Sequence, residues 1–400
     1  MMKQKDSGPA GGNWVPLAVT LAIQAMVSMA ALTMPVMAPV AAPALGVSPT
    51  YTGLYLAIVY IGAVLASLAA GSVVKRFGAI RASQFGLLLC AAGLALCAVP
   101  SLPVVAVGAF LIGLGYGPIT PASSHLLALT TPAHRMSLVF SIKQTGVPVG
   151  GMLAGALVPG AMLLIGWQGA LLAVAVANVL CALVSQPLRG QLDADRQPDQ
   201  PVKLGNLLQP LRLVFSHRAL ALLALCSFVF STVQQSLTGY LVTYLHESLA
   251  YGLVAAGLAL SVSQIGGVAG RIAWGYVSDR WMSARPTLAM LAAIMAVSGI
   301  ATALLTTSMP TFLVLAVLVV FGASGIGWNG VYLAEVARQA PPGMASVATG
   351  GTLAVTFFGV VLGPPVFGAI SGAWGSYRAG FAALAVPTLI CCFALLRARR

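Results

Sequence analysis

Residues 270–280 read Gly270-Arg271-Ile272-Ala273-Trp274-Gly275-Tyr276-Val277-Ser278-Asp279-Arg280. They end a long apolar segment with a charged turn, and they carry an arginine inside the apolar part. Arg271 and Asp279 are eight residues apart, which is about 12 Å along a helix. An arginine at that depth in hydrocarbon costs at least ~2.5 kcal/mol on insertion scales, so it normally faces a wet cavity or a partner. The stretch therefore predicts where a helix leaves a membrane and where an anion binds.

The composition predicts a membrane protein. The chain has 400 residues, of which 59% are hydrophobic and only 7% are charged, and its mean hydropathy is +0.96. Soluble domains carry about 25% charged residues, so this chain has too little charge for a surface that faces water. Apolar runs long enough to cross a bilayer recur from end to end. They predict twelve membrane-spanning helices, at residues 14–38, 51–74, 80–99, 103–129, 136–162, 167–187, 219–245, 251–277, 286–308, 311–337, 345–371 and 376–396.

The basic residues predict the orientation of these helices. The net charge is +13, and 17 of the 20 lysines and arginines fall on one side of the twelve-helix topology. The other side carries only Arg378, while Lys143 and Arg271 lie within spans. Loops with an excess of Lys and Arg stay in the cytoplasm. Both termini are therefore expected in the cytoplasm, and the basicity reflects topology rather than binding to nucleic acid.

The N-terminal segment and the cysteines suggest no processing or metal site. The first span is too long for the core of a signal peptide, so we expect it to remain as the first helix. All six cysteines lie in apolar spans without the spacing of metal ligands. Neither a metal nor a cofactor is expected.

The chain is expected to consist of two similar halves. A polar stretch at 189–217 separates six spans from six, and glycines of the fifth span recur in the eleventh at an offset of 213. This organisation predicts five segments: a cytoplasmic tail at 1–13, a six-helix bundle at 14–188, a cytoplasmic linker at 189–218, a second six-helix bundle at 219–396 and a basic tail at 397–400.

A duplicated loop motif identifies a family resemblance. The loop after the second span reads Gly71-Ser72-Val73-Val74-Lys75-Arg76-Phe77-Gly78, and its second copy begins at Gly275 and ends in Asp279-Arg280. The pattern resembles the Gly-x-x-x-Asp-Arg-x-Gly loop of the major facilitator superfamily, and the resemblance covers nearly the whole chain. It implies that Lys75, Arg76, Asp279 and Arg280 latch an inner gate. Lys75 replaces the usual acid, so the latch is expected to be one-sided.

Two other patterns of that family weigh against a drug antiporter. Ala109 stands where the fourth-helix pattern places an arginine before Gly113-Leu114-Gly115. The fifth-helix antiporter pattern Gly-Pro-x-x-Gly-Gly is only approached by the stretch from Gly146 to Gly151.

Arg271 is the leading candidate for substrate binding. Gln264 and Ser278 lie seven residues before and after it, so they share its helical face. A structural arginine that snorkels to the surface would need no such polar stripe. The spacing from Arg271 to Gly275 resembles the eighth-helix arginine of monocarboxylate and oxalate–formate transporters, which implies that it binds a carboxylate. A guanidinium suits this role because it donates two parallel hydrogen bonds to the two oxygens.

Lys143 is the second cation within a span, about two helical turns from the expected cytoplasmic end of the fifth helix. It either lines the cavity or snorkels to the surface. The resemblance implies that the fifth and eighth helices face each other, so that Lys143 and Arg271 flank one site. No Asp or Glu lies in the middle of a span. Two buried cations without an acidic partner favour an anionic substrate.

We also expect a close approach of these two helices through glycines. Gly146 and Gly150 on the fifth helix are expected to pack against Gly266 and Gly270 on the eighth.

Further candidates are polar side chains beside these cations or on the helices that line the pathway in this family. For each, the alternative is an ordinary hydrogen bond between helices, worth about 0.6 kcal/mol on average. The candidates are Gln144, Gln264, Asn329, Tyr332, Gln234, Tyr116 and Gln24.

Together these features predict an all-α secondary active transporter for a small organic anion, most simply a monocarboxylate. It is expected to work by alternating access, as a monomer in the lipid bilayer of a bacterial inner membrane. Coupling is open between proton symport and anion exchange. The alternative is proton-coupled efflux of a drug or metabolite. A membrane sensor would need an output domain, and an enzyme would need a set of catalytic groups that the spans lack.

Overall fold

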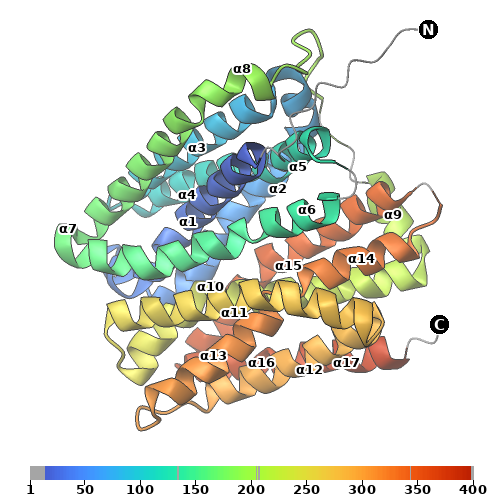
Figure 1. Ribbon diagram of the computed structural model, residues 1–400. Helices are drawn as coiled ribbons and strands as arrows, with labels where there is room; N and C mark the ends of the chain where they lie inside the picture. Colours follow the sequence, from blue (N-terminus) through green and yellow to red (C-terminus); the bar gives the residue numbers. More distant parts are fainter. Residues whose placement is uncertain (1–13, 133–134, 204, 206–207, 343, 398–400) are drawn as a thin grey trace, which may run out of the picture.

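The computed structural model describes residues 14–132, 135–203, 205, 208–342 and 344–397, in which all regular secondary structure is helical (Figure 1). The expected tail at 1–13 and residues 398–400 of the basic tail lie outside the described residues. Within them, eleven helical segments are long and apolar enough to cross a membrane. A helix satisfies its own backbone hydrogen bonds, which makes it one of the few structures that can span hydrocarbon.

The first half consists of α1 (Val15–Ala44), the 3₁₀ turn η1 (Pro49–Tyr51), α2 (Thr52–Phe77), α3 (Ala79–Cys97), α4 (Leu102–Tyr116), α5 (Ile119–Thr130), α6 (Met136–Gln144) and α7 (Gly146–Val184). The linker forms η3 (Gln186–Leu188), α8 (Arg189–Leu192) and α9 (Leu208–Ser216). The second half consists of α10 (Arg218–Leu249), α11 (Leu253–Arg280), α12 (Ala284–Ala303), α13 (Thr311–Gly325), α14 (Asn329–Gln339), α15 (Ala345–Ala373), α16 (Tyr377–Ala383) and α17 (Ala385–Arg397).

The helix α7 contains most of two predicted spans, 136–162 and 167–187. Its backbone is non-helical at Gly166, where φ is 75° and ψ is 168°. Figure 1 shows the chain turning back there, so the fifth and sixth crossings are joined without a loop. A positive φ favours glycine, because a side chain would clash with the backbone. The eleven apolar segments therefore make twelve crossings, which confirms the predicted number.

Four crossings are broken into two helices. The fourth changes from α4 to α5 at Gly117-Pro118, the fifth from α6 to α7 at Thr145, the tenth from α13 to α14 at residues 326–328, and the twelfth from α16 to α17 at Leu384. Each break ends a helix inside the apolar region, where its last carbonyl groups lose their intrahelical partners. These carbonyl groups are then available to a buried cation.

The halves lie against one another, with the blue-to-green segments on one side of Figure 1 and the yellow-to-red segments on the other. In each half, the glycine-rich crossing packs on the first crossing of the same half. A Cβ added at Gly150 would strike the Ala25 carbonyl of α1, and one added at Gly363 would strike Thr232 of α10. These two glycines are related by the sequence offset of 213. The repeat is therefore present in the packing.

The glycine contact expected between the fifth and eighth crossings was wrong. Gly146 and Gly150 lie against α1, whereas Gly266 and Gly270 lie against carbonyl groups of α13. Residues four apart share one face of a helix, and this face of α7 and of α11 points to a helix of its own half.

The helices α7 and α11 nevertheless pack closely, through different residues. Gly155 faces the backbone of Gly257, and the Ser261 hydroxyl donates to the Met152 carbonyl over 2.8 Å. We call the end of the bundle where α1 begins and α17 ends the terminal end, and the opposite end the distal end. The contacts between α7 and α11 lie towards the distal end.

Candidate substrate site

Arg271 lies on α11 beside two helix breaks. Its Nε donates to the Ile326 carbonyl over 3.2 Å, directly after the end of α13. Its Nη1 donates to the carbonyl of Gln144, the last residue of α6. Carbonyl groups at a helix C-terminus carry partial negative charge, so they partly neutralise the guanidinium. Among the described residues, no ion pair includes Arg271. It is held by backbone from both halves rather than by a carboxylate.

Lys143 is on α6, next to this contact. Its side chain is only 1% exposed, and its Nζ has no hydrogen-bond partner within the described part of the chain. A snorkelling lysine would have its Nζ in solvent, and this Nζ is buried. Arg271 lies close enough to act on it electrostatically. The structure therefore brings the two cations together, each from a different half. Gln144 takes part through its backbone carbonyl.

A small cavity lies between the halves. The candidates Tyr116, Gln234 and Gln264 line it, together with Gln235, a further polar candidate on the seventh crossing. Its other lining residues were missed by sequence reasoning: Ser28, Ala31, Leu32, Tyr60, Val147 and Thr238. Its volume is about 20 Å³, room for roughly one water molecule. Tyr116 also lies within electrostatic range of Arg271, so it connects the cavity to the cations. A substrate can enter only when the halves move apart.

Tyr60 is the most informative of the missed residues. It accepts a hydrogen bond from Gln235 Nε2 over 2.7 Å, and its ring packs edge-on against Tyr116 with centroids 5.8 Å apart. It thus links α2 of the first half to α10 of the second. Its sequence context is an uninterrupted apolar run, which gave no signal. Ser28 could have been found, because it follows Gln24 by one helical turn on the same face.

Asn329 and Tyr332 do not line this cavity. The Gln234 side-chain oxygen accepts hydrogen bonds from Trp328 Nε1 over 3.1 Å and from Asn329 Nδ2 over 3.4 Å. Tyr332 packs edge-on against Trp328, with ring centroids 5.2 Å apart. These contacts fix the start of α14 against α10. They match the alternative of ordinary interhelical bonds.

Gln24 is fully buried and has a similar structural setting. Its side-chain oxygen accepts from the Thr120 hydroxyl over 3.1 Å, and a Cβ on Gly146 would strike its side chain. It therefore holds α1 against α5 and the start of α7.

Tyr240 bridges the two halves at the distal end. The Gly53 N–H donates to the Tyr240 hydroxyl oxygen over 2.7 Å. The same hydroxyl lies 2.7 Å from the Thr50 carbonyl oxygen and 3.1 Å from that of Pro364. It thereby joins η1 and α2 of the first half to α10 and α15 of the second.

The expected latch residues are at the terminal end. Asp279 and Arg280 are exposed, and no ion pair of the described residues includes them. Arg76 lies over the Phe77 ring and donates to the Gln200 carbonyl over 3.5 Å. Lys75 is exposed and contacts the linker through its backbone carbonyl. In this conformation the four residues form no latch with one another.

A linker carboxylate that sequence reasoning missed occupies this end. Asp193 accepts hydrogen bonds from the N–H groups of Ile80 over 2.7 Å and Arg81 over 3.1 Å, at the start of α3. Burial raises the pKa of the Asp193 carboxyl, and the bond from Ile80 opposes this rise. Sequence reasoning treated it only as part of a polar linker.

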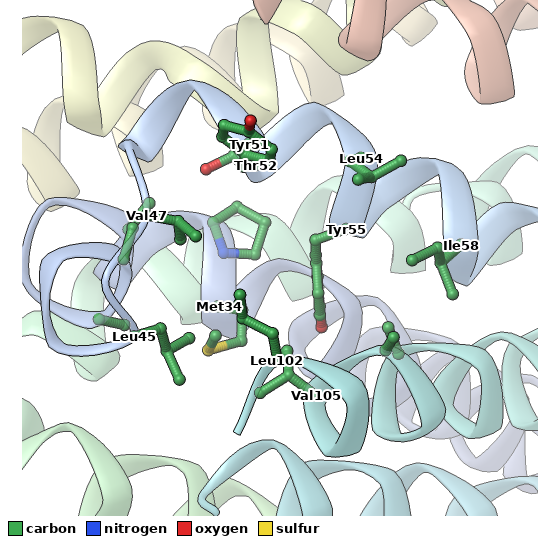
Figure 2. Close-up of a pocket in the computed structure, with 16 residues that line it drawn as sticks. Met34, Leu45, Val47, Tyr51, Thr52, Leu54, Tyr55, Ile58, Leu102 and Val105 are labelled. Carbon is green, nitrogen blue, oxygen red and sulfur yellow. The ribbon is translucent and has the colours of Figure 1, made fainter. Parts of the chain in front are cut away.

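A second pocket is larger but unsuited to an anion. Its volume is about 310 Å³, and it lies between α1, α2 and α4 at the distal end (Figure 2). Its lining includes Met34, Leu45, Ile58 and Val105, and it contains no charged side chain and no predicted site residue. An anion would lose its hydration there without gaining a partner.

Comparison with known proteins places these features in a family. The profile of the Major Facilitator Superfamily matches residues 17–355. An uncharacterized MFS-type transporter of Mycobacterium tuberculosis is 25% identical over 371 residues, which are 92% of this chain and 81% of the relative. The gentisate transporter of Corynebacterium glutamicum is 25% identical (77% and 70%), and the benzoate transport protein of Acinetobacter baylyi is 23% identical (70% and 66%).

A solved structure agrees on the fold. A bacterial homolog of the human lysosomal transporter Spinster superposes with a TM-score of 0.76 at 14% identity, over 98% of both chains. The chain is thus a multi-pass membrane transporter rather than an enzyme. With the family profile matched over most of its length, the chain belongs to the major facilitator superfamily.

Proposed function

We propose that this transporter moves a small organic monocarboxylate by alternating access, with Arg271 and Lys143 binding the carboxylate. The observation that carries the proposal is the meeting of two cations from opposite halves, one of which has no hydrogen-bond partner in the described part of the chain. A carboxylate supplies the acceptor that Lys143 lacks, and its second oxygen can accept from the Arg271 fork.

Aromatic acids are the first substrates to test. The similarity to a benzoate transport protein and a gentisate transporter supports this class. Tyr60 and Tyr116 line the cavity between the halves, and Trp328 donates a hydrogen bond to Gln234, which also lines it. Aromatic rings pack favourably edge-on or offset, as Tyr60 and Tyr116 do.

Binding is expected to couple to the movement of the halves through Arg271. The bond from Arg271 to the Gln144 carbonyl joins α11 of the second half to α6 of the first. A carboxylate is a stronger acceptor than a carbonyl group, so it competes for this guanidinium. Replacing the carbonyl by the substrate frees α6 from α11. The four latch residues, Lys75, Arg76, Asp279 and Arg280, would then act in the opposite state, when the terminal end closes.

We further propose the oligomeric state, membrane location, topology and coupling that were expected from the sequence. The protein works as a monomer in a bacterial inner membrane, with both termini in the cytoplasm and two six-helix bundles joined by the linker at 189–218. Transport is coupled to a proton or to a second anion.

Exchange assays in proteoliposomes test the function. Purified protein should exchange radiolabelled benzoate for unlabelled benzoate or gentisate, and Arg271→Gln should abolish this exchange. Arg338→Gln is the matched control, because Arg338 is exposed on α14 and should leave exchange unchanged. Unaltered exchange in Arg271→Gln contradicts the site. Transport of ethidium in place of any carboxylate supports the alternative, drug efflux.

A further inference from the structure

We propose that Lys143 carries the proton that travels with the organic anion: it is neutral in the empty transporter and charged when the anion is bound. This inference rests on the proposed function and names the co-substrate of the same site.

The surroundings of Lys143 disfavour a permanent charge. Its Nζ is buried without a hydrogen-bond acceptor among the described residues, and Arg271 is bonded to the carbonyl of the next residue, Gln144. A buried ammonium without a partner is costly, and a second cation beside it adds repulsion. Arg271 keeps its own charge because a guanidinium remains protonated in proteins and two carbonyl groups accept its hydrogen bonds.

The helices around Lys143 supply no carboxylate that could stabilise the ammonium. The described parts of α1 and α7, and of α6 apart from Lys143 itself, contain no charged residue. On α5 the only titratable side chain is His125, which is bonded to Asp195 in the linker. On α11, Asp279 and Arg280 are exposed at its end, two turns beyond Arg271. The incoming anion is therefore the negative charge that stabilises protonated Lys143.

The site carries the same net charge in the empty and the loaded state. In the empty state the site carries one positive charge, on Arg271. In the loaded state it carries two positive charges and the negative charge of the carboxylate, which again makes one. The proton comes from the solution on the side of entry, binds the Lys143 amine and leaves to the other side after the anion dissociates. One anion and one proton cross together, so the cycle moves no net charge.

Accumulation assays in proteoliposomes distinguish a pH gradient from a membrane potential as the driving force. We expect wild-type protein to accumulate benzoate against a gradient when the lumen is alkaline. A membrane potential set by potassium and valinomycin should have no effect. Lys143→Gln and Lys143→Arg keep a constant charge at this position, so the anion then crosses alone. Both variants should lose the response to the pH gradient and accumulate benzoate only under a lumen-positive potential.

The matched control is Lys203→Gln, the same substitution at an exposed linker lysine, which should behave as wild type. Accumulation by the wild type that follows the potential overturns the inference, as does pH-driven accumulation by Lys143→Gln.

A second measurement, made on wild-type protein, keeps the inference testable if the Lys143 variants no longer transport. Benzoate binding to purified wild-type protein in weakly buffered detergent should take up about one proton per anion bound, and no proton uptake overturns the inference. These failures differ from a failure of the proposed function, in which wild-type protein exchanges no carboxylate at all.

Discussion

Nε2 of His125 lies 2.6 Å from Oδ2 of Asp195, and this contact joins the terminal end of α5 to the linker. Glu335 lies 210 residues after His125, the offset that also relates Gly115 of the fourth crossing to Gly325 of the tenth, and Glu335 pairs with Arg285 Nε at 3.0 Å. The second half thus pairs its own charges at this end. The first half has a histidine where the second has the acid, and it takes its carboxylate from the linker.

A second linker carboxylate, Asp193, is expected to stabilise the start of α3. Asp193→Ala removes two hydrogen bonds from the first turn of α3. Loss of such a cap costs about 0.5–2 kcal/mol, and we expect this loss in the free energy of unfolding measured in detergent. Asp199→Ala is the control, because Asp199 is exposed in the same linker and should change stability by less than about 0.5 kcal/mol. Equal effects of the two substitutions would contradict the capping role.

The turn in α7 depends on the conformation of Gly166. Alanine fits there sterically, since the nearest side-chain atom lies 3.8 Å from an added Cβ, but the positive φ strains it. We expect Gly166→Ala to destabilise the protein by about 1–3 kcal/mol. Gly160→Ala in the same helix also meets no atom and has helical dihedral angles, so it should be neutral or slightly stabilising. The melting temperatures of the two variants test whether the positive φ at Gly166 requires glycine. A lower melting temperature for Gly160→Ala than for Gly166→Ala would contradict this requirement.

The bridge between the halves at the distal end is tested at Tyr240. Tyr240→Phe leaves the Gly53 N–H without its acceptor, which costs about 1–3 kcal/mol when the group stays buried. We expect a lower thermal stability and faster exchange of the Gly53 amide hydrogen. Tyr276→Phe, at an exposed tyrosine of α11, should change neither. Unchanged amide exchange in Tyr240→Phe would show that another contact joins the halves at this end.

Arginine geometry, beyond charge, is tested by Arg271→Lys. The guanidinium reaches carbonyl groups of two helices at once, and a lysine has a single nitrogen for both. We expect the apparent KM for benzoate exchange to rise at least tenfold, equivalent to about 1.4 kcal/mol or more of binding. A variant with wild-type KM would mean that positive charge alone is sufficient.

The sequence was enough to predict the twelve crossings, because run length and hydropathy follow from bilayer thickness. It also predicted that Arg271 and Lys143 come together. It did not reveal the partners of Arg271, because the carbonyl groups of Gln144 and Ile326 become free only where helices break. The search of the sequence for a partner of Arg271 considered only charged side chains, so it could not find these carbonyl groups.

Contacts between distant segments were equally hidden. Asp193 lies 113 residues from Ile80, and nothing in the linker composition distinguishes it from its acidic neighbours. The face chosen by Gly146 and Gly150 depends on how the helices are rotated about their axes. A glycine pattern does not define that rotation.

The turn at Gly166 joins the fifth and sixth crossings into one helical hairpin. Lys143 lies just before the first residue of α7, and Asp193 follows shortly after its last. Both ends of this hairpin thus reach the terminal half of the bundle, one beside the cation pair and the other beside the start of α3. One helical hairpin therefore connects the linker to the place where the anion is expected to bind.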